Sequence, residues 1–317
     1  GDGRNNALFA YILKLQQNSF SRTDIRDVLT VVNDYIFSDK LPQKELETIM
    51  REGAFQKQSF YDSKNHFLFD DFARFMIQKY HIVRISGRLH IWNGYAYIPS
   101  EAMIEKRMIE EIPRLKKQDR GEAMSYISLL LVDSEAEADP RYVAFRNGIY
   151  DIDEDIMLPL SPDIIVTNPI PHNYVMGAYD KFGDEFLDRL ACDDIQIRQI
   201  LEEAIGYPFL RKNELRKSFL LYGGKANGKS TFLDIIHTIL GEENIVSMDL
   251  RELGERFKTS QFFEVLANIG DDIADDFIND LAIFKKLVSG DRLNAERKGQ
   301  DPFDFAPYAK LFFSANT

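Results

Sequence analysis

Apolar residues in the first fifty positions recur every three or four places, which is the period of a helix packed along one face. The pattern predicts a helix over 6–17 and a second helix after Ser21, where Ser21 and Asp24 have the spacing of a capping pair. A third helix is expected to begin at Pro42, because proline suits the first turn of a helix. The sequence therefore predicts a helical module over residues 1–60.

Residues 66–210 mix the helical period with the alternating period of strands. Helices are expected over 70–80, about 101–135 and 182–205. Short apolar and aromatic runs bounded by turn residues predict strands at 82–85, 89–92, 95–98, 142–145 and 149–152. We therefore predict a second module of mixed α+β structure.

Residues 211–317 alternate buried strands with a helix. Apolar runs at 218–222, 265–270 and 309–316 predict the strands, and 231–240 predicts a helix with one apolar face. Strands that alternate with helices are typical of an α/β core. The chain as a whole is therefore assigned to the α/β class, with helical and mixed α+β modules ahead of this core.

The clearest chemical signal lies between the first strand and the helix of the last module. Residues 223–230 have the pattern of a phosphate-binding loop, in which backbone N–H groups and a helix N-terminus surround an anion. The expected nucleotide contacts are Gly223, Gly224, Ala226, Asn227, Gly228, Lys229, Ser230 and Thr231. We therefore expect ATP and Mg²⁺ as cofactors, with Lys229 at the β- and γ-phosphates and Ser230 as a ligand of Mg²⁺.

Hydrolysis needs further groups, which must hold the metal and orient the attacking water. The strand at 265–270 ends in Asp271 and Asp272. We assign Asp271 to the metal and Asp272 to the activation of water, in roles that can be exchanged, although acids also suit the start of a helix. Asn316 ends the last apolar strand and is expected beside the γ-phosphate, although asparagine is also common where a strand ends.

Composition excludes several classes of protein. The net charge of −12 argues against binding of nucleic acid over the whole surface, but 285–298 holds five basic residues against two acidic ones. A hairpin expected at 293–305 has Lys298 near its tip, where lysine either contacts a nucleic-acid backbone or is solvated surface. One cysteine and five scattered histidines exclude a disulfide framework and a cysteine zinc site. No apolar stretch is long enough for a membrane helix.

These segments together resemble one family. GGKANGKSTFLDII, NIGDDI, FKKLVSGDRLNAERKG and KLFFSANT are similar, in this order, to the superfamily 3 helicase core of phage- and plasmid-type primase–helicases. Upstream, RNNALFAYI and LPQKELETI resemble the helical module that follows a primase catalytic domain. FRNGIYDI and EEAIGYPFL resemble the poxvirus-type domain that precedes the helicase core. The resemblance covers nearly the whole chain.

The resemblance implies a truncated AAA+ core over residues 211–317 and, in the intact protein, a homo-hexameric ATPase and DNA helicase that replicates a phage, plasmid or other mobile element. It implies that Lys298, together with Arg297, contacts single-stranded or forked DNA in a central channel, and that Asn316 is the sensor 1 residue. It places an arginine finger beyond the end of this segment and a primase or polymerase domain before its start, so that the segment alone would hydrolyse little ATP.

The location that the resemblance implies is the cytoplasm of a bacterial host or of a virus-infected cell, without a membrane partner. A second function remains open. In this alternative the chain is a loader module that binds DNA or a polymerase, and its ATP site regulates assembly instead of unwinding.

Overall fold

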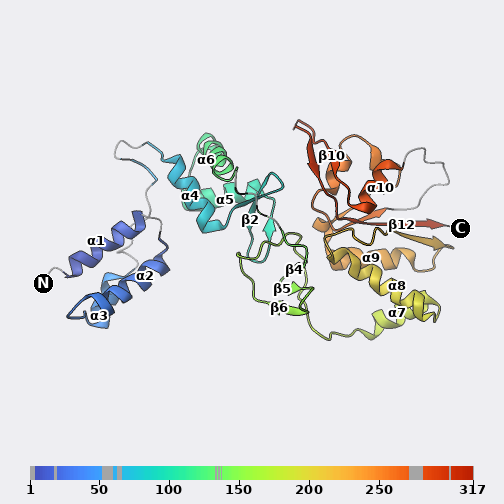
Figure 1. Cartoon of the computed structure of the whole chain (residues 1–317), viewed down its shortest axis with the longest axis horizontal. Helices are drawn as coiled ribbons and strands as arrows, with labels where there is room; N and C mark the ends of the chain where they lie inside the picture. The colour runs from blue at the N-terminus through green and yellow to red at the C-terminus, as the bar shows by residue number, and fades with distance from the viewer. Residues whose placement is uncertain are drawn as a thin grey trace. The chain divides into compact units, whose positions relative to one another are not determined.

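The structure is a computed structural model of mixed α/β class, as predicted (Figure 1). It describes residues 4–17, 20–51, 60–62, 66–132, 134, 136, 138–270, 281–299 and 301–316. The chain forms two compact units, which are residues 1–79 with 108–130 and residues 80–107 with 131–317. These units group the chain by spatial contact, and the three sequence modules remain a proposal.

The first unit is helical. Its elements are α1 (Arg4–Gln17), α2 (Arg22–Val31), a π-helical turn (Val32–Ile36), α3 (Gln43–Ile49), α4 (Phe69–Tyr80) and α6 (Lys117–Leu130), and α5 (Glu101–Glu111) begins in the second unit and ends in the first. The predicted capping pair is confirmed, because Ser21 Oγ accepts from the N–H of Asp24 and the Asp24 carboxylate accepts from the N–H of Ser21. The apolar faces of α1 to α3 meet in one cluster: Leu8, Ile12, Leu15, Ile25, Leu29, Leu41, Leu46 and Met50.

The second unit holds two small antiparallel sheets. The first is β1 (Val83–Ile85), β2 (Arg88–Trp92) and β3 (Tyr97–Ile98), and the second is β4 (Tyr142–Phe145), β5 (Gly148–Asp151) and β6 (Ile156–Leu158). The prediction of a strand from Tyr95 was wrong, because Asn93 Oδ1 accepts from the N–H groups of Tyr95 and Ala96 and extends the turn to Tyr97. The strand β6 was not predicted.

A four-stranded parallel sheet forms the centre of the second unit. Its order is β7 (Phe219–Gly223), β12 (Lys310–Asn316), β9 (Ala267–Gly270) and β8 (Ile245–Val246). Side chains of a strand alternate between the two faces of a sheet. Accordingly Phe312 packs with α9 (Lys229–Leu240) on one face, and Leu311 and Phe313 pack with α10 (Ala282–Ser289) on the other (Figure 1).

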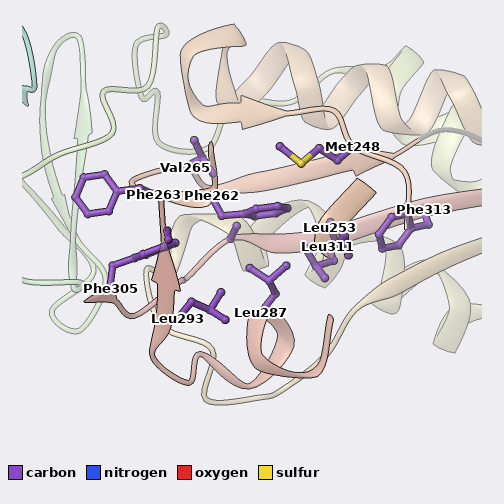
Figure 2. Close-up of a cluster of buried hydrophobic side chains, with 12 residues drawn as sticks. Met248, Leu253, Phe262, Phe263, Val265, Leu287, Leu293, Phe305, Leu311 and Phe313 are labelled. Carbon is purple, nitrogen blue, oxygen red and sulfur yellow. The ribbon is translucent and has the colours of Figure 1, made fainter. Parts of the chain in front are cut away.

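The face of the sheet that carries α10 also receives an antiparallel hairpin, β10 (Leu293–Ala295) and β11 (Phe303–Phe305). Figure 2 shows the buried cluster that joins sheet, helix and hairpin. Its labelled members are Met248, Leu253, Phe262, Phe263, Val265, Leu287, Leu293, Phe305, Leu311 and Phe313. The hairpin is therefore part of the core and is not an isolated surface loop.

Lys310 is a buried cation at the start of β12, with only 1% of its surface exposed. Its Nζ donates to the carbonyls of Leu210, Lys212 and Tyr308 and to Oδ1 of Asn213, at 2.7 to 2.9 Å. These bonds tie the central strand to the segment that precedes β7. Burial lowers the pKa of Lys310 to about 7.

This lowered pKa predicts a pH dependence of folding. Between about pH 7 and pH 10 the unfolded lysine keeps its proton while the folded one loses it, so the unfolded state binds more protons. The free energy of unfolding should therefore rise with pH through this window, relative to a Lys310→Met variant. Urea unfolding of both proteins at several pH values measures the difference. Parallel profiles for the two proteins would contradict the prediction.

Candidate nucleotide-binding site

The predicted phosphate-binding loop joins β7 to α9, as the sequence indicates. Strand β7 ends at Gly223, and α9 begins at Lys229 directly after Gly228. Gly228 has a φ of +93°, in the left-handed region that favours glycine. A Cβ on Gly223 would lie 2.5 Å from Nδ2 of Asn227, so a larger residue here would displace the end of the Asn227 side chain. Backbone conformation therefore explains the glycine at position 228, and close approach to Asn227 favours a glycine at position 223.

The loop, the first turn of α9 and the end of β12 enclose a cleft of about 690 Å³. The lining residues are Lys225, Ala226, Asn227, Gly228, Lys229, Ser230, Thr231, Ser314 and Asn316. Ligand sites in proteins commonly measure roughly 300–1,000 Å³. The cleft thus brings together most of the predicted nucleotide contacts, while Gly223 and Gly224 lie in the loop outside its lining. Ser314 was not predicted, because its position follows from strand pairing.

The side chain of Lys229 crosses this cleft. It is 9% exposed, and its Nζ donates to the carbonyl oxygens of Gly223 and Gly224 at 2.8 and 2.9 Å. It also donates to Oδ1 of Asn227 at 3.2 Å and to Oδ1 of Asn316 at 3.1 Å. All four acceptors are neutral, and an ammonium group has only three protons to share among them. A phosphate oxygen would be a stronger partner than any of these, because both groups would then be charged.

Strand register brings the separate motifs to one edge of the sheet. Asn316 lies opposite Gly223 on β7, and Phe313 lies opposite Gly270 on β9. Since the three strands are parallel, their carboxyl ends meet on the side of the cleft. Asp271 and Asp272 follow Gly270 directly but lie outside the described residues, so their metal and catalytic roles stay predictions.

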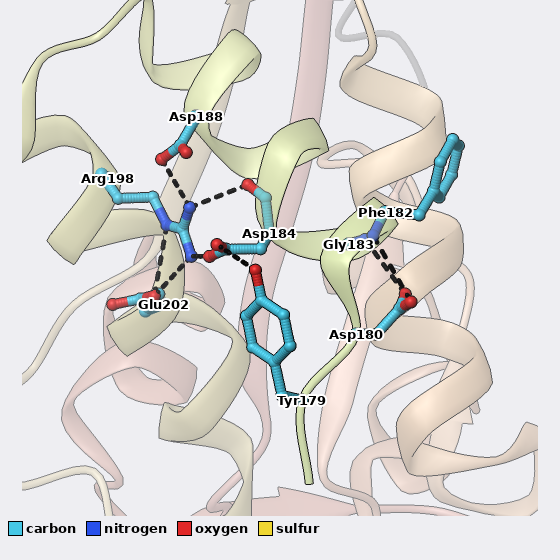
Figure 3. A network of polar contacts seen from close by, with 8 residues as sticks. All are labelled: Tyr179, Asp180, Phe182, Gly183, Asp184, Asp188, Arg198 and Glu202. Atoms are coloured by element: carbon cyan, nitrogen blue, oxygen red, sulfur yellow. Dashed lines mark hydrogen bonds and ion pairs between the residues drawn. The ribbon is translucent and has the colours of Figure 1, made fainter.

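Two helices support the loop from the side. Leu190 and Phe186 of α7 (Lys181–Ala191) would lie 3.4 and 3.6 Å from a Cβ on Gly228, so α7 packs against the loop. Arg198 of α8 (Ile195–Gly206) joins the two helices. Figure 3 shows its guanidinium between three carboxylates, those of Asp184, Asp188 and Glu202, at 2.6 to 2.8 Å. The hydrogen bond from Arg198 lowers the pKa of Asp184, so this ion pair stays charged to a lower pH than an ordinary aspartate would allow.

The two predicted DNA contacts have different surroundings. Lys298 is exposed beyond the end of β10. The guanidinium of Arg297 lies 4.3 Å from the ring centroid of Phe303 and 5.1 Å from that of Phe263. Burial lowers the pKa of Arg297. Lys298 is therefore accessible to a ligand, whereas Arg297 is engaged within the chain.

The part of the chain that the structure describes has neither a cluster of metal ligands nor a membrane-spanning helix. No group of three or more histidine, cysteine, aspartate and glutamate side chains there could hold a metal ion. No described helix is long and apolar enough to cross a membrane. For Mg²⁺ the described chain offers the hydroxyl of Ser230 in the cleft, and the predicted second ligand is Asp271.

Two family models match the chain. The family described as "D5 N terminal like" matches residues 14–206, and a family of unknown function (DUF5906) matches residues 221–317. The comparison with curated proteins finds no match.

Among solved structures, two apo structures of the C-terminal region of NrS-1 have a TM-score of 0.50, at 14% and 13% identity. The alignments cover 77% of this chain and 56% of those chains, so this chain spans little more than half of their length. At such low identity the likeness shows a common fold. The D5 N terminal like model, in contrast, covers well over half of the chain. The chain therefore belongs to the D5 N terminal like family, and the resemblance to primase–helicases that its sequence shows is confirmed.

Proposed function

We propose that this chain is the ATP-binding segment of a replicative primase–helicase, which hydrolyses ATP to move along DNA. The observation that carries the proposal is the meeting of Lys229 and Asn316, from two motifs 87 residues apart, in one cleft beside the phosphate-binding loop. The alternative is that the motif is only a glycine-rich turn with a structural lysine. Such a turn would not need Asn316, a polar residue from the end of a second parallel strand, beside that lysine.

Each residue of the proposed site has one role in phosphoryl transfer. The N–H groups at the start of α9 would bind a phosphate of the nucleotide, and Lys229 would exchange the carbonyls of Gly223 and Gly224 for the γ-phosphate. Ser230 and Asp271 would hold Mg²⁺, and the metal would supply positive charge to the phosphates. Asp272 accepts a proton from the attacking water, and Asn316 orients that water or a γ-phosphate oxygen.

The strand order supports an AAA+ core for this segment. The strand before the phosphate-binding loop lies beside β12, and β12 lies beside the strand that leads to Asp271 and Asp272. In such a core, ATP binds at the edge where the parallel strands end. A homo-hexamer around DNA, with Lys298 in the channel, follows as part of the same proposal.

Stabilisation by nucleotide tests the site directly. A ligand that binds only the folded state raises the free energy of unfolding, by about 2.7 kcal/mol when its concentration is 100 times its dissociation constant. We expect ATP with Mg²⁺ to raise the midpoint of thermal unfolding of the second unit. The rise should shrink when EDTA removes Mg²⁺ and when Ser230 is replaced by alanine.

A thermal midpoint that does not respond to millimolar ATP and Mg²⁺ would contradict the proposed site. Strand displacement from a forked DNA by the intact protein then separates the helicase from the loader alternative. ATP-dependent assembly on DNA without displacement would favour the loader.

A further inference from the structure

Phe263 and Glu264, just before β9, are held by side chains from two distant segments of the second unit. The guanidinium of Arg88, from the start of β2, lies 5.5 Å from the ring centroid of Phe263. Arg297 lies 5.1 Å from the same centroid and 4.3 Å from that of Phe303. Cations prefer aromatic faces most strongly where water is excluded. Phe263 therefore receives one guanidinium from β2 and one from the hairpin.

The hairpin also packs on Phe263 through its own aromatic residues. The rings of Phe303 and Phe305 lie edge-to-face with Phe263, at centroid distances of 5.3 and 5.5 Å. Figure 2 shows Phe263 and Phe305 together at one side of the buried cluster. Arg297 thus continues a contact that already joins the hairpin to the segment before β9.

Glu264 has an unusual backbone conformation. Its φ is +59°, a left-handed conformation that is costly for a residue with a side chain. Its carboxylate is 11% exposed and lies 3.0 Å from Nε2 of the fully buried His90 and 3.5 Å from Nη1 of Arg88. Its backbone carbonyl accepts from Nδ2 of Asn168 at 2.7 Å. Such strain persists only where surrounding contacts fix the conformation, so this segment is held in one geometry.

The segment leads directly into the strand that ends at the nucleotide site. Val265 and Leu266 are buried, β9 begins at Ala267, and Asp271 follows its last residue. The hairpin base, Phe263 and β9 consequently form one packed assembly. A shift of β9 would move the base of the hairpin, because closely packed cores transmit displacement.

We propose that Arg297 is a positioning residue and not a DNA contact. It fixes the turn end of the hairpin to Phe263, and so ties the position of the adjacent Lys298 to the strand that leads to Asp271 and Asp272. The part of this inference that concerns DNA rests on the proposed function. The fixing of the hairpin rests on the contacts of the free protein.

Hydrogen exchange in the free protein tests whether Arg297 fixes the hairpin to Phe263. Arg297→Gln should speed amide exchange across residues 293–305 about tenfold, because the contacts of the guanidinium with the rings of Phe263 and Phe303 are lost. Arg297→Lys should speed exchange less than Arg297→Gln, since a lysine keeps the charge that the rings attract but not the planar group. The matched control is Arg292→Gln, which removes the same charge from an exposed position at the other end of the hairpin. Unchanged exchange in Arg297→Gln, or an equal increase in the control, would overturn the proposal.

Salt dependence of single-stranded DNA binding tests the second part. Each lost phosphate contact reduces the slope of log K against log[salt] by about 0.7 for single strands. If Arg297 only positions Lys298, Arg297→Gln added to Lys298→Ala should cause no further loss of slope or affinity. A second decrement of similar size, rescued by Arg297→Lys, would show that Arg297 is itself a phosphate contact. The unaltered chain could fail to bind DNA while Arg297→Gln still speeds amide exchange in the hairpin. In that case the proposed function would be wrong, and the conclusion that Arg297 fixes the hairpin would remain.

Discussion

Replacing Lys229 by methionine in the intact protein is expected to lower ATP hydrolysis by roughly 10²–10³-fold, the usual effect of removing one group that stabilises transition-state charge. The side chain of methionine fills similar space but has neither the charge nor the protons that a γ-phosphate requires. In the structure the ammonium of Lys229 is already in the cleft, bonded to four oxygens of the loop and of β12. Binding of ATP should therefore weaken as well.

Two measurements check this prediction. Titration with a fluorescent ATP analogue gives the binding affinity, and phosphate release in the presence of DNA gives the rate. Lys217→Met is the matched control, since Lys217 is an exposed lysine on the segment that precedes β7 and does not line the cleft. Equal hydrolysis by the intact unaltered protein and its Lys229→Met variant would exclude this cleft as the catalytic site.

Replacing Phe312 by alanine is expected to lower the free energy of unfolding of the second unit by about 3–5 kcal/mol, the range for removal of a buried phenylalanine. Phe312 is fully buried on β12, which lies between β7 and β9. Its ring stacks on Phe219 of β7 at a centroid distance of 4.9 Å and an angle of 10°. The cavity would open beneath the loop and α9, so neighbouring side chains can collapse into it only by distorting the sheet.

Urea unfolding followed by circular dichroism measures this loss. Leu220→Ala serves as the control, because it truncates an apolar side chain on the neighbouring strand that is 58% exposed. That variant should differ from the unaltered protein by about 0.5 kcal/mol or less. Similar losses for the two variants would mean that Phe312 does not lie in the core of the sheet.

Signals confined to a few neighbouring residues were sufficient to predict much of this protein. The capping pair at Ser21 and Asp24, the glycine pattern at 223–230 and the strands at 218–222 and 309–316 all depend on local backbone preference and apolar period. The family resemblance rests on the same short motifs. The cleft residues around Lys229 could be named for this reason before their positions were known.

Other elements were missed because their local signal is weak. Strands β6 and β8 have three and two residues, too few to show an alternating pattern, and they exist because a longer neighbour offers hydrogen bonds. The helix α10 was not predicted either, although its buried Leu287 packs into the cluster beside β12.

By itself, the sequence determined the glycine-rich loop between a strand and a helix and the family of the chain, because these depend on residue types at fixed short spacing. Only the tertiary structure decided which strands are neighbours, and hence that Asn316 reaches Lys229 across 87 residues. It also decided that Arg297 lies against Phe263 and Phe303 while Lys298 is exposed, although the two basic residues are adjacent. Contacts between distant segments arise from packing of the whole core, and no local pattern encodes them.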